Sequence, residues 1–347
     1  MFNNNRIGGQ PAPLPVPAPA PAAVQQPQGQ VAGPPAAGEM PADRLIAAVS
    51  QPSKAAPMLK LGLDAATAPA DWGDVSIADR KANLKQLQSL ARQLKAEGRP
   101  GVEIWSRLTR AAVDSYAAKS LPAARKSDFV MQDLVVAVIG SEGPRHLKTY
   151  QSLPWVRHPD PLAQTFFDDW AALGIPPANG DWKSVGWAGE ELDRHHCADF
   201  RPEIADGSDN QIFHTLFYQF MAYTTQAPFT IHGGSIVHEF KDEGTSSEDH
   251  NACLAAVTTG MALRRQRDSQ DAAAWLQDWP SITQAAYGKD GGPEIKAGTA
   301  GPRARAADKA IRELLAHKPL LWKAENAVID GVKYAKVAGE FISRIWK

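Results

Sequence analysis

The chain of 347 residues contains only two cysteines, Cys197 and Cys253, and it has no continuous apolar run of the length that crosses a membrane. Two cysteines cannot build a disulfide framework, which favours a reducing site of action. Without an apolar run of about 18 residues, a membrane-spanning helix is not expected. The N-terminus also lacks the apolar segment of a secretory signal peptide, so we expect a protein that is cytoplasmic when made.

Three motifs with well-defined chemistry are also missing. The sequence contains no Gly-x-Ser-x-Gly nucleophile elbow, no phosphate-binding P-loop and no Gly-x-Gly-x-x-Gly dinucleotide fingerprint. Serine hydrolysis of the elbow type and nucleotide-driven chemistry therefore have little support.

Acidic residues are absent from residues 1–38, which consist mainly of Pro, Ala, Gln, Gly and Asn. Such a composition buries too little apolar surface to offset the entropy cost of folding, so residues 1–40 are predicted to be a disordered Pro/Ala-rich leader. This start resembles the leaders of bacterial effectors that contact-dependent secretion systems export unfolded. The resemblance implies export into another cell without a cleaved signal peptide, and the alternative is a flexible linker.

The net charge of −1 conceals an uneven distribution of charge along the chain. Residues 160–250 contain 16 acidic and 4 basic residues, a local balance of −12, so the remainder carries +11. A strongly acidic centre repels a nucleic-acid backbone, and we expect no nucleic-acid partner. The same charge suits a cation or a basic protein partner, and the alternative is a solvated acidic face.

Hydrophobic periodicity predicts a mostly α fold. Residues 76–97 and 102–119 are predicted to form a helical hairpin, with Ser76 as the N-terminal cap of the first helix. Residues 129–139 are almost uniformly apolar and are assigned to a helix rather than a strand. The predicted regions are 1–40 for the disordered leader, 41–153 for the N-terminal helical region, 154–302 for a larger central helical domain, and 303–347 for C-terminal amphipathic helices.

Two further segments have distinctive compositions. Residues 154–187 are expected to form Trp-rich loops whose indole rings anchor them to the core. The tryptophans concerned are Trp155, Trp170, Trp182 and Trp187. Residues 303–347 are expected to form two helices that separate at Pro319, the second of which is basic and amphipathic. Such a helix either packs on its own domain or contacts an anionic membrane surface through residues 320–347.

The residues best suited to chemistry lie between positions 195 and 253, where six of the nine histidines and both cysteines are found. Residues 209–226 are predicted to form a helix with His214 and Tyr218, four residues apart, on one edge of its apolar stripe. A buried His–Tyr pair that only stabilises the fold is the alternative to a catalytic role. A second helix is predicted to begin near Ser247, with acidic residues in its first turn.

His238, Glu239 and Asp242 form the most distinctive local pattern. It resembles the His-Glu-x-x-His core of zinc proteases, with Asp242 where the second histidine of that core stands. The resemblance implies that His238 and Asp242 bind a divalent metal such as zinc, while Glu239 polarises a bound water.

A site without metal requires only a base and a carboxylate that orients it. His214 or His238 can supply the base, and Glu239, Asp242 or Asp249 the carboxylate. Cys253 stands in an Ala-rich helical context and is expected to be a buried, unreactive thiol.

The sequence thus supports two hypotheses of different kinds. The first is a delivered bacterial effector or toxin-like hydrolase that acts on an unknown protein or polymer substrate. The second is a non-enzymatic interaction protein that binds a basic protein partner or a membrane surface. The candidate catalytic residues are His214, Tyr218, His238, Glu239 and Asp249, and the candidate metal ligands are His238 and Asp242.

Overall fold

The structure is a computed structural model that describes residues 68–140, 142–151, 160–175, 198–205, 211–228, 231–232 and 247–331, without the side chains of 142, 247 and 317–331. The predicted leader, residues 1–40, lies outside these ranges. The described ranges contain helices, one isolated bridge between Phe200 and Gly288, and no β-strand. The prediction of a mostly α fold is therefore confirmed.

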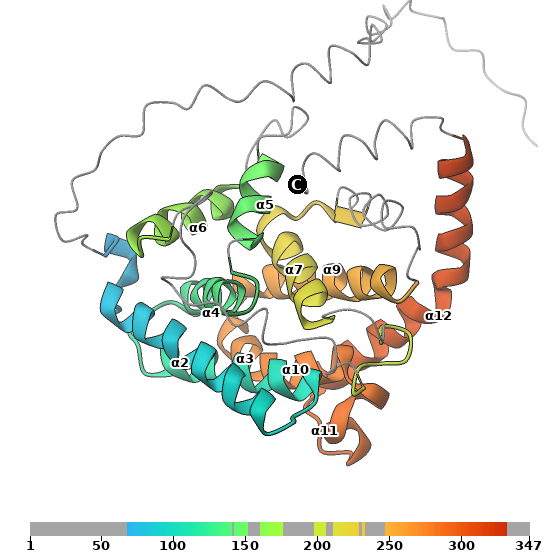
Figure 1. The fold of residues 1–347 in the computed structure, drawn as a ribbon, viewed down its shortest axis with the longest axis horizontal. Helices are drawn as coiled ribbons and strands as arrows, with labels where there is room; N and C mark the ends of the chain where they lie inside the picture. The colour runs from blue at the N-terminus through green and yellow to red at the C-terminus, as the bar shows by residue number, and fades with distance from the viewer. Residues whose placement is uncertain are drawn as a thin grey trace, which may run out of the picture. The chain divides into compact units, whose positions relative to one another are not determined.

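The α-helices of the described ranges are α2 (Ile77–Ala96), α3 (Gly101–Ala117), α4 (Ala123–Val138), α5 (Glu142–Gln151), α6 (Pro161–Ala172), α7 (Gln211–Thr225), α9 (Ser247–Arg267), α10 (Ala272–Tyr287), α11 (Gly292–Lys296) and α12 (Pro302–Gly331) (Figure 1). Short 3-10 turns are η1 (Ala70–Trp72) and η5 (Lys289–Gly291).

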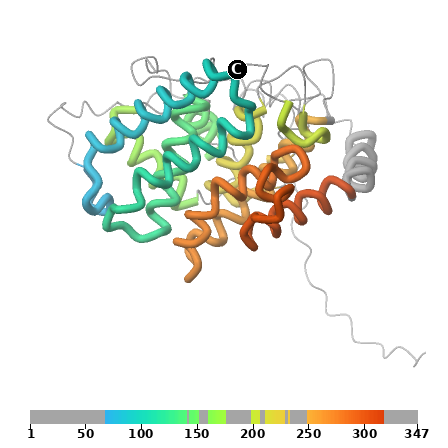
Figure 2. Tube along the Cα trace, turned by 90° about the horizontal axis from the view of Figure 1, so that it is seen from below, coloured from blue at the N-terminus to red at the C-terminus, as the bar shows by residue number. Residues whose placement is uncertain are grey.

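Helix α7 packs along α9, and α10 packs on α3, α9 and α12. In Figure 2 the early helices gather on one side and the C-terminal helices on the other, with α7 between them. One hydrophobic cluster extends from Trp72 in η1 to Leu315 in α12. Helices of the predicted 41–153 and 154–302 regions contribute to this cluster, and the boundaries between those regions stay a prediction.

The predicted helical hairpin is confirmed as α2 and α3. Ser76 Oγ accepts a hydrogen bond from the Asp79 amide at 3.0 Å, and the Ser76 amide donates one to Asp79 Oδ2 at 2.9 Å. Gly98, with φ of +67°, and Pro100 then end α2 and redirect the chain into α3. The two helices pack against each other and against α4.

Helix α4 confirms the helical assignment of residues 129–139, but it also brings charged residues into the core. Asp128 and Asp133 are fully buried among its apolar side chains. A buried carboxylate is tolerated only where cations and hydrogen-bond donors surround it. Each of these aspartates has such a set of partners.

Asp133 is held by α2 and α3. Arg80 forms an ion pair with it, Asn83 donates a hydrogen bond to its Oδ2 at 2.6 Å, and the Tyr116 hydroxyl donates to the same oxygen. The Arg80 guanidinium also lies over the ring of Phe129, with its central carbon 4.2 Å from the ring centroid. One buried carboxylate therefore joins α2, α3 and α4.

Asp128 is held from α7 and α9. The Tyr223 hydroxyl donates to Asp128 Oδ1 at 2.8 Å, and Arg267 reaches both carboxylate oxygens at 2.7 Å. Burial raises the pKa of Asp128, while the hydrogen bond and the charge of Arg267 oppose that change.

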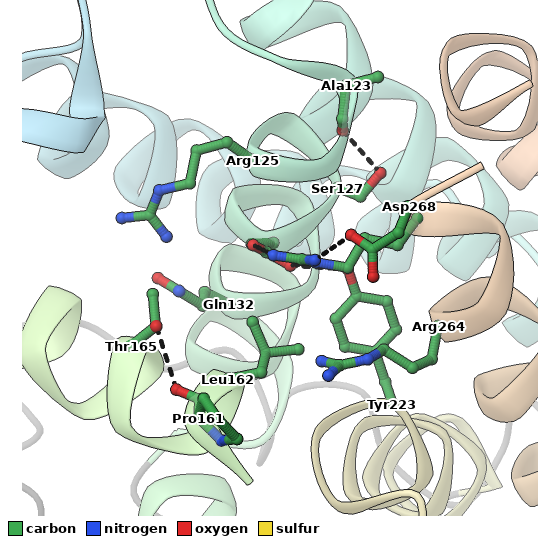
Figure 3. A network of polar contacts seen from close by, with 12 residues as sticks. Ala123, Arg125, Ser127, Gln132, Pro161, Leu162, Thr165, Tyr223, Arg264 and Asp268 are labelled. Atoms are coloured by element: carbon green, nitrogen blue, oxygen red, sulfur yellow. Dashed lines mark hydrogen bonds and ion pairs between the residues drawn. The ribbon is translucent and has the colours of Figure 1, made fainter. Parts of the chain in front are cut away.

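A third buried carboxylate, Asp169, attaches α6 to α4. Arg125 donates to Asp169 Oδ2 at 2.7 Å, and Gln132 donates to the same oxygen at 2.6 Å. The Trp72 indole N–H donates to Asp169 Oδ1 at 2.7 Å. Figure 3 shows Arg125 and Gln132 on the side of α4 where α6 lies, with Tyr223 approaching from α7.

The prediction that Trp170 lies in a loop is wrong, because Trp170 belongs to α6. Asp160 caps this helix by accepting a hydrogen bond from the Leu162 amide at 2.8 Å, and Pro161 occupies its first turn. Trp170 is nevertheless fully buried and stacks edge-to-face on Phe166, so its anchoring role is confirmed. Trp155, Trp182 and Trp187 lie outside the described residues.

The predicted break at Pro319 is also wrong, since α12 continues through it to Gly331. An internal proline removes one backbone hydrogen bond, but good helix formers such as Leu, Lys, Ala and Glu stand on both sides of this one. Residues 332–347, the rest of the predicted basic helix, lie outside the described residues.

Removal of the charge at Asp133 is expected to destabilise the fold strongly. Asp133→Asn leaves the buried guanidinium of Arg80 without its counter-ion, and the free energy of unfolding should fall by about 3–5 kcal/mol. Chemical denaturation followed by circular dichroism measures this change. The matched control is Asp278→Asn, which breaks a more exposed ion pair with Arg303 and should cost less than about 1 kcal/mol. Equal losses in the two variants would contradict the role given to Asp133.

Candidate functional site

Helices α7 and α9 are neighbours that pack along each other (Figure 1). At their beginnings, Gln211 and His214 of α7 contact Asp249 of α9. Further along both helices, Gly260 of α9 lies directly against the Gln219 backbone of α7. Since the contacts advance in the same direction along both helices, α7 and α9 run parallel. Their N-termini therefore lie together, and this shared end holds the candidate site.

Gly260 makes the close approach of the two helices feasible. A Cβ atom at this position would lie 2.3 Å from the Gln219 carbonyl oxygen and 3.0 Å from the Ala222 Cβ. The Gln219 carbonyl belongs to the backbone, so the helices would have to separate to admit a side chain.

Gly260→Ala should therefore lower the free energy of unfolding by about 1–3 kcal/mol through overpacking. The control is Gly301→Ala, because no atom lies within 4 Å of a Cβ built at Gly301. Thermal unfolding of both variants measures the difference. If Gly260→Ala were as stable as the Gly301 control, the described packing of α7 on α9 would be incorrect.

The first turn of each helix follows from its sequence. Helix α7 buries Ile212, Leu216 and Phe220 on its predicted apolar stripe. Helix α9 has Glu248 and Asp249 in its first turn, where negative charge is favourable at the positive end of the helix dipole. When the two helices pack together, the buried Asp249 carboxylate therefore lies next to the start of α7.

His214 and Asp249 form the central pair of the candidate site. His214 Nδ1 lies 3.2 Å from Asp249 Oδ1, and Gln211 Nε2 donates to the same oxygen at 2.5 Å. The His214 side chain retains 19% exposure, whereas that of Asp249 retains 4%. If Asp249 is ionised, Nδ1 donates to it and Nε2 carries the lone pair. The arrangement can therefore accept a proton at Nε2.

Tyr218 is buried one turn after His214 and meets Phe217 edge-to-face at a centroid distance of 5.3 Å. Of the predicted catalytic residues, the structure thus brings His214 and Asp249 into contact and places Tyr218 deeper in the core. His238, Glu239 and Asp242 lie outside the described residues, so the base and ligands assigned to them stay predictions.

Cys253 and His232 form a second pair, near the His214–Asp249 pair. The Cys253 Sγ lies 3.5 Å from His232 Nδ1, one helical turn beyond Asp249. Cys253 is fully buried, as expected. Burial lowers the pKa of His232 to about 4, so this imidazole is neutral near pH 7. A neutral imidazole next to a buried thiol favours the unionised thiol.

Sequence reasoning missed two of these contributors. Gln211 stands three residues before His214, and the helical spacing alone could have indicated that both share a face. His232 meets Cys253 only through tertiary packing, since the two residues are 21 positions apart, and no local signal in the sequence indicates that contact.

No family model, curated protein or solved structure matches this chain. The functional argument therefore rests on its own residues.

Within the described ranges, no group of three or more His, Cys, Asp and Glu side chains is arranged to hold a metal ion. The predicted zinc ligands fall outside those ranges, and the metal hypothesis is not tested by this observation. Among the described helices, none is both long and apolar enough to cross a membrane.

The depressed pKa of His232 predicts acid sensitivity. The folded state keeps His232 neutral down to about pH 4, whereas the unfolded chain binds a proton near pH 6.5. Stability is therefore fully present above about pH 6.5 and falls as the pH drops toward 4, by about 3 kcal/mol in total. Denaturation curves between pH 7 and 4 should show a shallower decline for His232→Gln than for the wild type. Identical declines would show that His232 is not buried as described.

Proposed function

We propose that the protein is a toxin-like hydrolase, delivered as a bacterial effector, in which His214 is the general base and Asp249 orients it. The observation that carries this proposal is the contact of His214 Nδ1 with Asp249 Oδ1 at 3.2 Å. The contact occupies Nδ1, so Nε2 is the ring nitrogen that can take up a proton, on an imidazole that solvent partly reaches.

The geometry supports a division of roles among three side chains. The Gln211 amide fixes the Asp249 carboxylate, and the carboxylate fixes the tautomer and plane of the His214 ring. His214 Nε2 then removes a proton from water or from a substrate hydroxyl, and Asp249 stabilises the imidazolium that forms.

Delivery and substrate are further parts of the proposal. The Pro/Ala-rich, acid-free leader supports export into another cell, and the substrate is a protein or another polymer. Under the alternative proposal, the protein is an interaction module that binds a basic partner through its acidic centre, and the His214–Asp249 contact only stabilises the α7–α9 pair.

Expression in bacterial cells tests the catalytic proposal. The wild-type protein should arrest growth in the cytoplasm or, when fused to an export signal, in the periplasm. His214→Gln removes the base, and Asp249→Asn favours the wrong tautomer of His214. Each substitution should lower hydrolysis by about 10²–10⁴-fold and relieve the growth arrest. Peptide and cell-wall polymer preparations, assayed for newly released amino and reducing groups, provide the biochemical measurement.

The control is again Asp278→Asn, which removes a carboxylate paired with Arg303 on another part of the fold and should retain full toxicity. Thermal unfolding must show that His214→Gln and Asp249→Asn are folded. Folded variants that keep wild-type toxicity would overturn the hydrolase assignment and favour the interaction module.

A further inference from the structure

Residues 198–205, which we call the strap, cross the ends of two helices. Asp199 reaches the N-terminus of α3, where its two oxygens accept hydrogen bonds from the amides of Val102 and Glu103, each at 3.1 Å. Helix α3 has no capping side chain of its own, since Pro100 stands at that position. The strap thus supplies the missing cap and a negative charge at the positive end of the helix dipole.

The opposite charge of the strap lies at a helix C-terminus. The buried Arg201 donates to the carbonyl oxygens of Ala286 and Ala285 at the end of α10, at 2.7 and 2.6 Å, and forms an ion pair with Asp308 of α12. A cation is favourable at this negative end of α10. The strap is therefore electrostatically matched to both helix ends that it covers.

A cavity of about 570 Å³ lies beside the strap, between the start of α3, the end of α10 and α11. Its walls combine apolar side chains of Pro100, Val102 and Pro293 with three cations and two carboxylates. The charged side chains are Arg107, Lys289, Lys296, Glu103 and Asp199.

The carboxylates of this cavity are already engaged within the protein. Asp199 accepts from the α3 amides, and Glu103 forms an ion pair with Arg107 at 2.6 Å. Among the described residues, no carboxylate lies within 4 Å of the Lys289 ammonium, and Lys296 pairs only with the exposed Asp290 at the rim. The lining thus has one more cation than carboxylate, and the buried Val102 side chain supplies an apolar wall.

We infer that this cavity binds a small organic anion, whose phosphate or carboxylate group pairs with Lys289 and Lys296 and whose compact apolar part contacts Val102 and Pro293. The cavity has the volume of ordinary small-molecule sites, which are mostly apolar with a few convergent polar groups. This site is separate from the His214–Asp249 pair, and the inference does not depend on the proposed hydrolase activity.

A ligand in this cavity also holds the strap in place. The Lys289 amide donates to the Asp199 carbonyl oxygen at 2.6 Å, so the residue that binds the anion is itself bonded to the strap. At its other end, the strap accepts a hydrogen bond at the Glu203 carbonyl oxygen from Asn251, two residues beyond Asp249 in α9. Binding should therefore reduce local opening of the strap and of the α3 cap.

Hydrogen exchange with inorganic phosphate and with malonate as probes tests the inference, each at an ionic strength matched with sodium chloride. The amides of Val102, Glu103, Arg201 and Lys289 report on the strap contacts. At a probe concentration of about four times its Kd, binding should slow hydrogen exchange about five-fold at amides that exchange only from the free protein. Protection by phosphate alone identifies a phosphoryl ligand, and protection by malonate alone identifies a carboxylate ligand.

The double variant Lys289→Ala/Lys296→Ala should lose this protection. Both lysines are exposed, so the variant is expected to fold. The matched control is Lys81→Ala/Lys85→Ala, which removes two exposed lysines of α2 that do not line the cavity and should respond like the wild type. Absence of protection by both probes in the wild type would overturn the inference, as would equal protection in the Lys289/Lys296 variant.

Discussion

The fold depends on the pairing of carboxylates buried along α4. Asp133 forms an ion pair with Arg80 of α2, and Asp128 forms one with Arg267 of α9. Arg125 of α4 forms an ion pair with Asp169 of α6. Because each of these charges is costly to bury alone, the helices that carry their partners must pack on α4 in one relative arrangement. Apolar contacts tolerate small shifts between helices, whereas hydrogen-bonded ion pairs fix the position of one helix along the other.

The same framework determines what the shared end of α7 and α9 can do. Gly260 lets the two parallel helices approach closely, and their first turns then bring His214 to Asp249. The proposed base, His214, lies at a partly exposed edge, whereas the Asp249 carboxylate that contacts it is buried. The strap attaches to α9 at Asn251 and connects this end of the molecule to the cavity at α3.

Much of the fold could be predicted because its signals are local. Ser76 and Asp79 form a capping box within four residues, and the stripe of Ile212, Leu216 and Phe220 follows the helical repeat. The prediction of secondary structure from sequence is wrong where residues that favour a helix stand next to residues that disfavour one. Pro319 predicts a break although α12 continues through it, and the Trp, Pro, Gly and Asp content of residues 154–187 predicts loops although Trp170 belongs to α6.

For this protein, the sequence by itself determined the helical class, the local Ser76 cap, the apolar stripes and the residue types available for chemistry, since each depends on neighbours within a few positions. Only the tertiary structure decided that Asp249 is the partner of His214, that His232 meets Cys253 and that Asp199 caps a helix 97 residues away. These pairings join residues far apart in the chain. They arise from the packing of helices around buried charges, which no local pattern encodes.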